Sequence, residues 1–212
     1  IGPTGQGKTT LLTFLAGQAM RHHDLKVFFF DRHRGAEIFT RAVQGAYVGF
    51  DGDEKNVSLN PFDCRNTPNN RAFLRRWLKA ITMVDDALSE KEIGRAVTTA
   101  FDYLKPEERI LKNLYKSCFS PTGNMRRELF RWINPDQYGN IFNAENDSLD
   151  LASKRFMAFD FTHIFEDETL APAVISYIMH RIMAETGDTG VPSLIMIDET
   201  APMLKHPMFR DY

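Results

Sequence analysis

The chain has 212 residues, of which 43% are apolar and 25% are charged. These values are typical of a globular protein with a buried core and exclude a wholly disordered chain. Its 26 basic and 28 acidic side chains give a formal net charge of −2, which argues against a strongly basic nucleic-acid binder. Two cysteines are too few for a disulfide framework. The apolar runs are far shorter than the roughly 18 residues of a membrane-spanning helix, so we expect no membrane crossing.

The first 66 residues alternate between helix and strand patterns. Residues 8–20 predict a helix with Leu11, Leu12 and Leu15 on one side. The run KVFFFD at 26–31 is apolar and ends in an acid, which is typical of a strand buried on both faces of a parallel sheet. A second helix is predicted at 35–44 and a short strand at 47–50.

Residues 67–134 have a different pattern, with apolar stripes at helical spacing and no strand signal. Ser89 and Glu92 have the spacing of a capping box, which predicts a helix start at Ser89. We therefore interpret 67–134 as an all-helical insertion between two parts of an α/β core, 1–66 and 135–212.

The alternation resumes after the insertion. Residues 155–161 (RFMAFDF) predict a strand, residues 174–183 fit one face of a helix, and 193–198 (SLIMID) predict a second buried strand that ends in an acid. Strands alternating with helices indicate an α/β fold with a mainly parallel sheet.

The first residues carry a phosphate-binding pattern, G-x-x-x-x-G-K-[ST]. It is formed by Gly2, Pro3, Thr4, Gly5, Gln6, Gly7, Lys8 and Thr9. Glycines let the backbone curl so that its N–H groups point at phosphates, and the helix that follows adds its positive N-terminal dipole. We expect Lys8 to reach the β- and γ-phosphates of ATP, the hydroxyl of Thr9 to bind Mg²⁺, and Thr10 to lie near the α-phosphate.

A second motif follows the last predicted strand, where Asp198 and Glu199 end the run LIMI. Ligands of parallel sheets bind beyond the carboxyl ends of the strands. We therefore expect Asp198 to hold Mg²⁺, directly or through water, and Glu199 to polarise the attacking water as a general base. The alternative for Glu199 is that it only tunes the surroundings of the metal.

Asp31 and Asp160 also follow apolar strands. Residues 31–34 (DRHR) could lie at the nucleotide edge or at a subunit boundary. The alternative, which we prefer at this point, is strand termination with local ion pairing.

The ordered set of motifs resembles the large ATPase of type IV secretion systems, the fourth member of the VirB series. The segments that carry this resemblance are GPTGQGKTT, FFFDRHRGAEIFTRA, NPF, TPNNRAFLRRWL, NIFNAENDSLDL, FMAFDFTHI and LIMIDET.

The resemblance implies a RecA-like P-loop NTPase with Walker A and Walker B motifs, in which Gly2 to Thr10 bind ATP, Asp198 binds Mg²⁺ and Glu199 drives hydrolysis. It also implies a peripheral motor at the cytoplasmic face of the bacterial inner membrane, often a hexamer. Such a motor energises assembly of the secretion channel and pilus and transfer of protein or DNA, together with other inner-membrane components.

Two further functions stay open: a DNA-translocating coupling ATPase, and a nucleotide-binding scaffold without useful turnover. Because only Ile1 stands where a strand should precede the phosphate loop, we expect the chain to be a slice of a longer protein. By the resemblance, the sensor strand and the arginine finger would lie beyond Tyr212.

Overall fold

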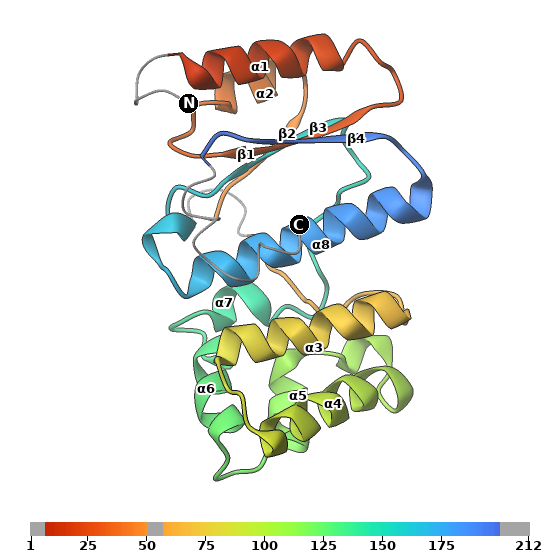
Figure 1. The fold of residues 1–212 in the computed structure, drawn as a ribbon, viewed down its shortest axis with the longest axis vertical. Helices are drawn as coiled ribbons and strands as arrows, with labels where there is room; N and C mark the ends of the chain where they lie inside the picture. The colour runs from red at the N-terminus through yellow and green to blue at the C-terminus, as the bar shows by residue number, and fades with distance from the viewer. Residues whose placement is uncertain (1–6, 51–56, 200–212) are drawn as a thin grey trace. The chain divides into compact units, whose positions relative to one another are not determined.

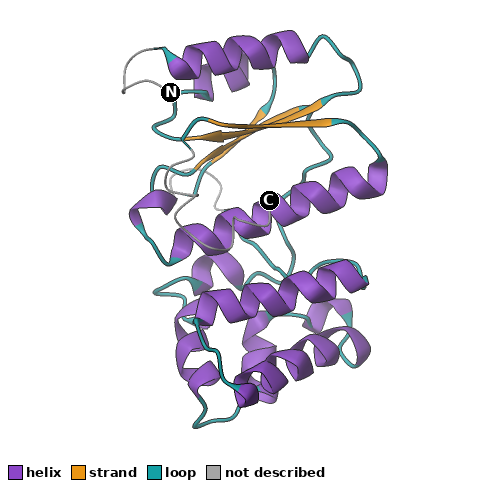
Figure 2. Cartoon of the chain, viewed as in Figure 1, coloured by secondary structure: helices purple, strands orange, loops and turns teal. Residues whose placement is uncertain are grey.

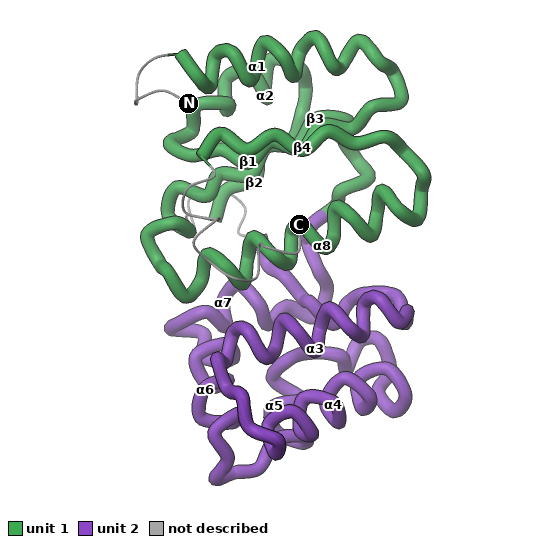
Figure 3. The backbone as a smooth tube through the Cα atoms, in the orientation of Figure 1, with its two compact units in different colours: residues 1–56, 150–212 green, residues 57–149 purple. Residues whose placement is uncertain are grey.

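The computed structural model describes residues 7–50 and 57–199 (Figure 1). Within them the chain forms two compact units, one from residues 7–50 with 150–199 and one from residues 57–149 (Figure 3). The second unit contains the predicted insertion 67–134 and extends beyond it at both ends. The segments that enter and leave this unit are hydrogen-bonded to each other. Leu59 N donates to Ile141 O at 2.6 Å, and Ser148 N donates to Ser58 O at 2.9 Å.

The first unit is built around a four-stranded sheet in the order β2-β3-β1-β4, in which every pairing is parallel (Figure 2). Its strands are β1 (Lys26–Asp31), β2 (Ala46–Val48), β3 (Phe156–Asp160) and β4 (Ser193–Ile197). In this register Asp31 lies opposite Asp160, and Asp198 N donates to Phe30 O at 3.0 Å. The sheet therefore brings the acidic strand ends predicted from the sequence to one edge.

Helices cover both faces of this sheet (Figure 1): α1 (Lys8–Ala19) and α2 (Glu37–Ala42) lie on one side, and α8 (Leu170–Thr189) lies on the other. Phe29 packs in the cluster that includes Ala16 of α1. Phe28 and Phe30 point to the opposite face, because side chains alternate along a strand. All three phenylalanines are buried, as the apolar run predicts for a strand with two covered faces.

The buried face of helix α1 differs from the apolar side that the sequence predicts. Leu12 packs against the core cluster, but Leu11 and Leu15 are 58% and 47% exposed. The buried face of the helix is formed by Thr13 and Ala16 instead, because small side chains let the helix approach the sheet closely. No helix among the described residues has the length and hydropathy needed to cross a membrane.

The second unit is helical, and the structure shows no strand in its described residues, 57–149. Its elements are α3 (Pro68–Thr82), α4 (Ala87–Asp102), a 3₁₀ turn η1 (Pro106–Glu108), α5 (Leu111–Cys118), α6 (Asn124–Ile133) and α7 (Gly139–Phe142). Its core contains the rings of Trp77, Trp132 and Phe142, whose centroids lie 5.2 to 6.2 Å apart.

The predicted start of α4 at Ser89 is two residues too late. The helix begins at Ala87, and the carboxylate of Asp86 accepts hydrogen bonds from the backbone N–H and the hydroxyl of Ser89. Glu92 does not close a capping box on Ser89, since its carboxylate accepts from Ser120 N at 2.9 Å. An upstream aspartate can cap the helix in the same way as a serine, and it begins the helix earlier.

Candidate active site

The N-terminus of α1 has the geometry of a phosphate site. Gly7 precedes the helix in the left-handed region, at φ 73° and ψ 18°, which glycine adopts without steric cost. Lys8, Thr9 and Thr10 form the first turn, which contains no acidic residue. The N–H groups and the dipole of this turn favour an anion. The other predicted phosphate-loop residues, Gly2, Pro3, Thr4, Gly5 and Gln6, lie outside the described residues.

The two predicted motifs meet at Thr9 and Asp198. Thr9 Oγ1 donates to Asp198 Oδ2 at 2.6 Å, although the residues are 189 positions apart. Thr9 is carried by α1 and Asp198 by the end of β4, the strand next to β1. The fold thus places the hydroxyl and the carboxylate that were expected to share a metal within hydrogen-bond distance.

These two side chains fit a magnesium ion. Mg²⁺ prefers oxygen ligands and is usually held by one or two carboxylates together with substrate phosphates and water. No group of three or more His, Cys, Asp or Glu residues in the described part of the chain could hold a metal by itself. A metal at Thr9 and Asp198 would therefore take its remaining ligands from phosphate and water, as expected of a nucleotide-bound ion.

Glu199 is paired with an arginine that the sequence did not single out for this role. Arg32 Nη1 lies 2.7 Å from Glu199 Oε2, and the side chains are 27% and 42% exposed. Arg32 follows β1, and its guanidinium lies 5.6 Å from the ring centre of Phe165. The available signal in the sequence was its position directly after a buried strand. The structure adds that β1 and β4 are neighbours and that both end at this edge.

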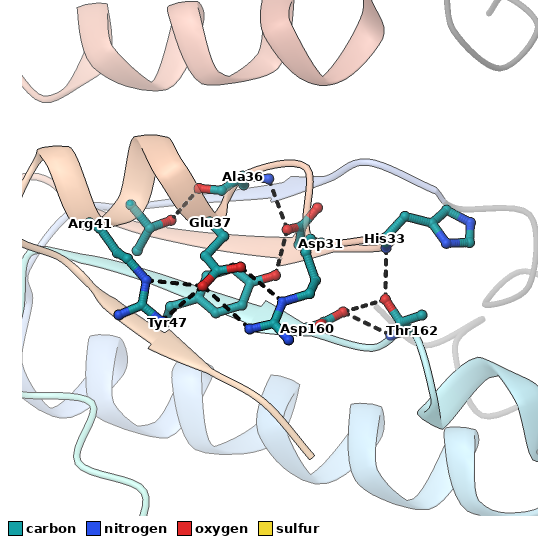
Figure 4. A network of polar contacts seen from close by, with 10 residues as sticks. Asp31, His33, Ala36, Glu37, Arg41, Tyr47, Asp160 and Thr162 are labelled. Atoms are coloured by element: carbon teal, nitrogen blue, oxygen red, sulfur yellow. Dashed lines mark hydrogen bonds and ion pairs between the residues drawn. The ribbon is translucent and has the colours of Figure 1, made fainter. Parts of the chain in front are cut away.

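The loop between β1 and α2 also reaches the phosphate side of the site. A Cβ added at Gly35 would lie 2.8 Å from Thr9 Cγ2, so this backbone packs directly on Thr9. His33 N donates to Thr162 Oγ1 at 2.7 Å, and Thr162 Oγ1 donates to Asp160 Oδ1 at 2.5 Å (Figure 4). These contacts tie the loop to the end of β3.

Asp31 anchors the start of this loop from inside the unit. Its Oδ2 accepts hydrogen bonds from Ala36 N at 2.9 Å and from the Tyr47 hydroxyl at 2.8 Å (Figure 4). Its Oδ1 is buried and has no hydrogen-bond partner among the described residues. Burial, and to a lesser extent the nearby charge of Asp160, raises the pKa of Asp31. Asp31 therefore acts as a structural anchor for the loop.

No family model matches the chain, but curated proteins do. It is 30% identical to the type IV secretion system protein VirB4 of Bartonella henselae over 217 residues, which are 100% of this chain and 27% of that protein. It is 29% identical to the conjugal transfer protein TrbE of Rhizobium radiobacter, over 99% of this chain and 26% of TrbE. It is 28% identical to PtlC of Bordetella pertussis, over 100% of this chain and 27% of PtlC. The chain thus spans about a quarter of the length of these relatives.

The fold also matches a solved structure, that of VirB4 from Thermoanaerobacter pseudethanolicus. The TM-score is 0.75 at 14% sequence identity, and the match covers 97% of this chain and 84% of the other. Together with the parallel sheet described above, this likeness confirms the predicted fold class.

Proposed function

From the homology of the chain, over its whole length, to VirB4 of type IV secretion and, over 99% of it, to TrbE of conjugal transfer, we propose that it is the nucleotide-binding core of an ATP-hydrolysing motor. The homology itself confirms the resemblance seen in its motifs. The observation that carries the proposal is the 2.6 Å hydrogen bond between Thr9 and Asp198. It joins a phosphate-loop hydroxyl to a strand-end carboxylate, the pair that holds Mg²⁺ in P-loop NTPases.

The reaction is ATP plus water to ADP plus phosphate. Gly2 to Thr10 bind the phosphates, through the backbone N–H groups of every residue of this loop except Pro3. Lys8 neutralises charge on the β- and γ-phosphates, and Thr10 lies near the α-phosphate. Thr9 and Asp198 would hold Mg²⁺, which when bound offsets the negative charge of the phosphate oxygens. Glu199 orients and polarises the attacking water.

At the scale of the whole protein, the names of the relatives support a role in a bacterial type IV secretion system. In this proposal the motor works as a homo-oligomer, a hexamer by resemblance, at the cytoplasmic face of the inner membrane. It contacts other inner-membrane components and energises channel and pilus assembly and substrate transfer. Direct DNA binding is not part of the proposal.

The test is Mg²⁺-dependent ATP turnover and ATP affinity of the full-length natural protein, compared with Lys8→Ala and Glu199→Gln. We expect Lys8→Ala to lose both ATP affinity and turnover. We expect Glu199→Gln to keep its ATP affinity and to turn over on the order of 100-fold more slowly, which is the usual contribution of a positioned base.

Arg41→Gln is the control, because Arg41 pairs with Glu37 on the exposed side of α2 and should leave turnover unchanged. If the wild type binds ATP but releases phosphate no faster than Glu199→Gln in every oligomeric state, the motor is rejected in favour of a nucleotide-binding scaffold.

A further inference from the structure

The loop of residues 31–36 contacts both halves of the proposed active site. Its Gly35 packs on Thr9 of the phosphate side, and its Arg32 pairs with Glu199 of the hydrolytic side. The loop also donates from His33 N to Thr162 at the end of β3. A segment that touches three strand or helix ends at one edge of the sheet can set their relative positions.

Arg32 is held in place by more than its ion pair. Its guanidinium lies over the ring of Phe165 in η2 (Ile164–Glu166), an arrangement that favours a cation electrostatically. Its Nε is buried and has no hydrogen-bond partner among the described residues. Buried donors are nearly always satisfied in folded proteins. Arg32 therefore keeps its Nη1 contact with Glu199 although its Nε donor has no partner among the described residues. This arrangement favours the Glu199 contact over satisfaction of Nε.

The backbone next to Arg32 is also constrained. His33 and Arg34 have φ values of 65° and 58°, in the left-handed region that non-glycine residues rarely adopt. Two consecutive residues in this region persist only where surrounding contacts impose them. Here the hydrogen bond from His33 N to Thr162 and the packing of Gly35 on Thr9 impose the conformation, and they fix the direction in which Arg32 leaves the strand.

We propose that Arg32 is the positioning residue of the general base: it holds the Glu199 carboxylate through Oε2 and leaves Oε1 for the attacking water. The proposal rests on the proposed ATP hydrolysis at this site. A glutamate has several rotatable bonds, and a carboxylate that must orient water gains from being held in one orientation. The ion pair with Arg32 is recorded at Oε2, at 2.7 Å from Nη1, which is the oxygen that the proposal assigns to positioning.

The test compares Arg32→Gln and Arg32→Lys with the wild type in the full-length natural protein, each alone and in the Glu199→Gln background. We expect Arg32→Gln to lower kcat on the order of tenfold, because a misplaced catalytic group loses rate rather than ground-state binding. KM and the affinity for a fluorescent ATP analogue should change less than about twofold. Arg32→Lys should restore part of kcat, since it keeps the charge but not the planar fork.

In the Glu199→Gln background, Arg32→Gln should have no further effect on kcat, because Arg32 acts through the missing carboxylate. Arg41→Gln is the matched control: it also removes an arginine from an ion pair in the first unit, 2.8 Å from Glu37, and should leave kcat and the melting temperature unchanged.

Three outcomes would overturn the proposal: an unchanged or increased kcat in Arg32→Gln, an equal loss of ATP affinity and kcat, or a further loss of kcat in the double variant. Absence of turnover in the wild type would instead reject the proposed function itself. If the wild type is active, Glu199→Gln is inactive and Arg32→Gln equals the wild type, only the role of Arg32 is rejected.

Discussion

Asp31 and Arg32 are adjacent residues with different roles, and the sequence alone did not separate them. Asp31 terminates β1 and anchors the following loop from a buried position, which fits the structural interpretation of residues 31–34. Arg34 pairs locally with Glu37 at 2.8 Å, which also fits it. Arg32 instead reaches Glu199 on the neighbouring strand, so the local interpretation fails at this residue.

The raised pKa of Asp31 predicts a pH-dependent effect of Asp31→Asn. A carboxyl group whose pKa is raised on folding stabilises the fold below its ordinary pKa, near 3.8, and this stability is lost as the pH rises through the folded value. Asparagine keeps the acceptor oxygen for Ala36 N and Tyr47 and removes the buried charge. We therefore expect Asp31→Asn to be more stable than the wild type at pH 7.

The measurement is the free energy of unfolding by denaturant between pH 4 and pH 7, and the advantage of Asp31→Asn should shrink as the pH falls. Asp31→Ala is the control: it leaves both donors without their acceptor and should lose about 1–3 kcal/mol per unsatisfied buried group. An advantage that grows on acidification would contradict the assignment of burial as the main cause.

At the scale of elements, two of the predicted strands match the structure more closely than the second predicted helix does, whereas the strand predicted at 47–50 is Ala46–Val48 and the helix predicted at 8–20 is Lys8–Ala19. The strand predicted at 26–31 is β1, residue for residue, and 193–198 differs from β4 by one residue, because an apolar run with turn residues on both sides defines a buried strand. The helix predicted at 35–44 is only Glu37–Ala42, since Gly35 belongs to the loop that packs on Thr9. Helix ends depend on such contacts and on competing caps, as Asp86 shows for α4.

Gly35→Ala tests the contact between this loop and α1. The added Cβ would lie 2.8 Å from Thr9 Cγ2, which is too close, and a rotation of Thr9 to relieve it would break the bond from Oγ1 to Asp198. We expect ATP turnover to fall on the order of tenfold or more, because the hydroxyl loses its position.

Gly187→Ala in α8 is the matched control, measured in the same turnover and melting assays. A Cβ there meets nothing within 4 Å, so the change should stabilise the helix by up to about 1 kcal/mol and leave turnover unchanged. Equal turnover in the wild type and Gly35→Ala would show that the loop can move away from Thr9 without consequence.

At the scale of the whole molecule, the described residues of the candidate site all lie in the first unit. The second unit has its own aromatic core around Trp132, which is fully buried and lies 6.2 Å from Trp77 and 5.6 Å from Phe142 between ring centroids. Such a core should determine the stability of the helical unit independently of the chemistry of the site.

Trp132→Ala should therefore destabilise the protein by about 3–5 kcal/mol, the usual result of emptying a large aromatic site. Trp132→Phe should lose much less, because it fills most of the space and removes an indole N–H that is buried without a partner in the described structure. Calorimetry would measure the unfolding. ATP affinity of the folded variants should match the wild type, and a parallel loss of affinity would contradict the independence of the site.

The sequence by itself determined which residues are candidate phosphate and metal ligands and which helices and strands carry them. The spacing of the phosphate loop, the apolar runs that end in acids and the helical stripes of residues 67–134 are local patterns, and each depends on neighbours along the chain. Because carboxyl ends of parallel strands meet at one edge, even the meeting of Thr9 with Asp198 could be expected from them.

Only the tertiary structure decided which strands are neighbours. The buried runs of β1, β3 and β4 look alike in sequence, and nothing local says that β1 lies between the other two. That order places Arg32 beside Glu199, and the left-handed backbone at His33 and Arg34 directs it there. Such a contact depends on how elements that are distant in sequence pack together. A sequence pattern reports only the conformational preferences of one segment.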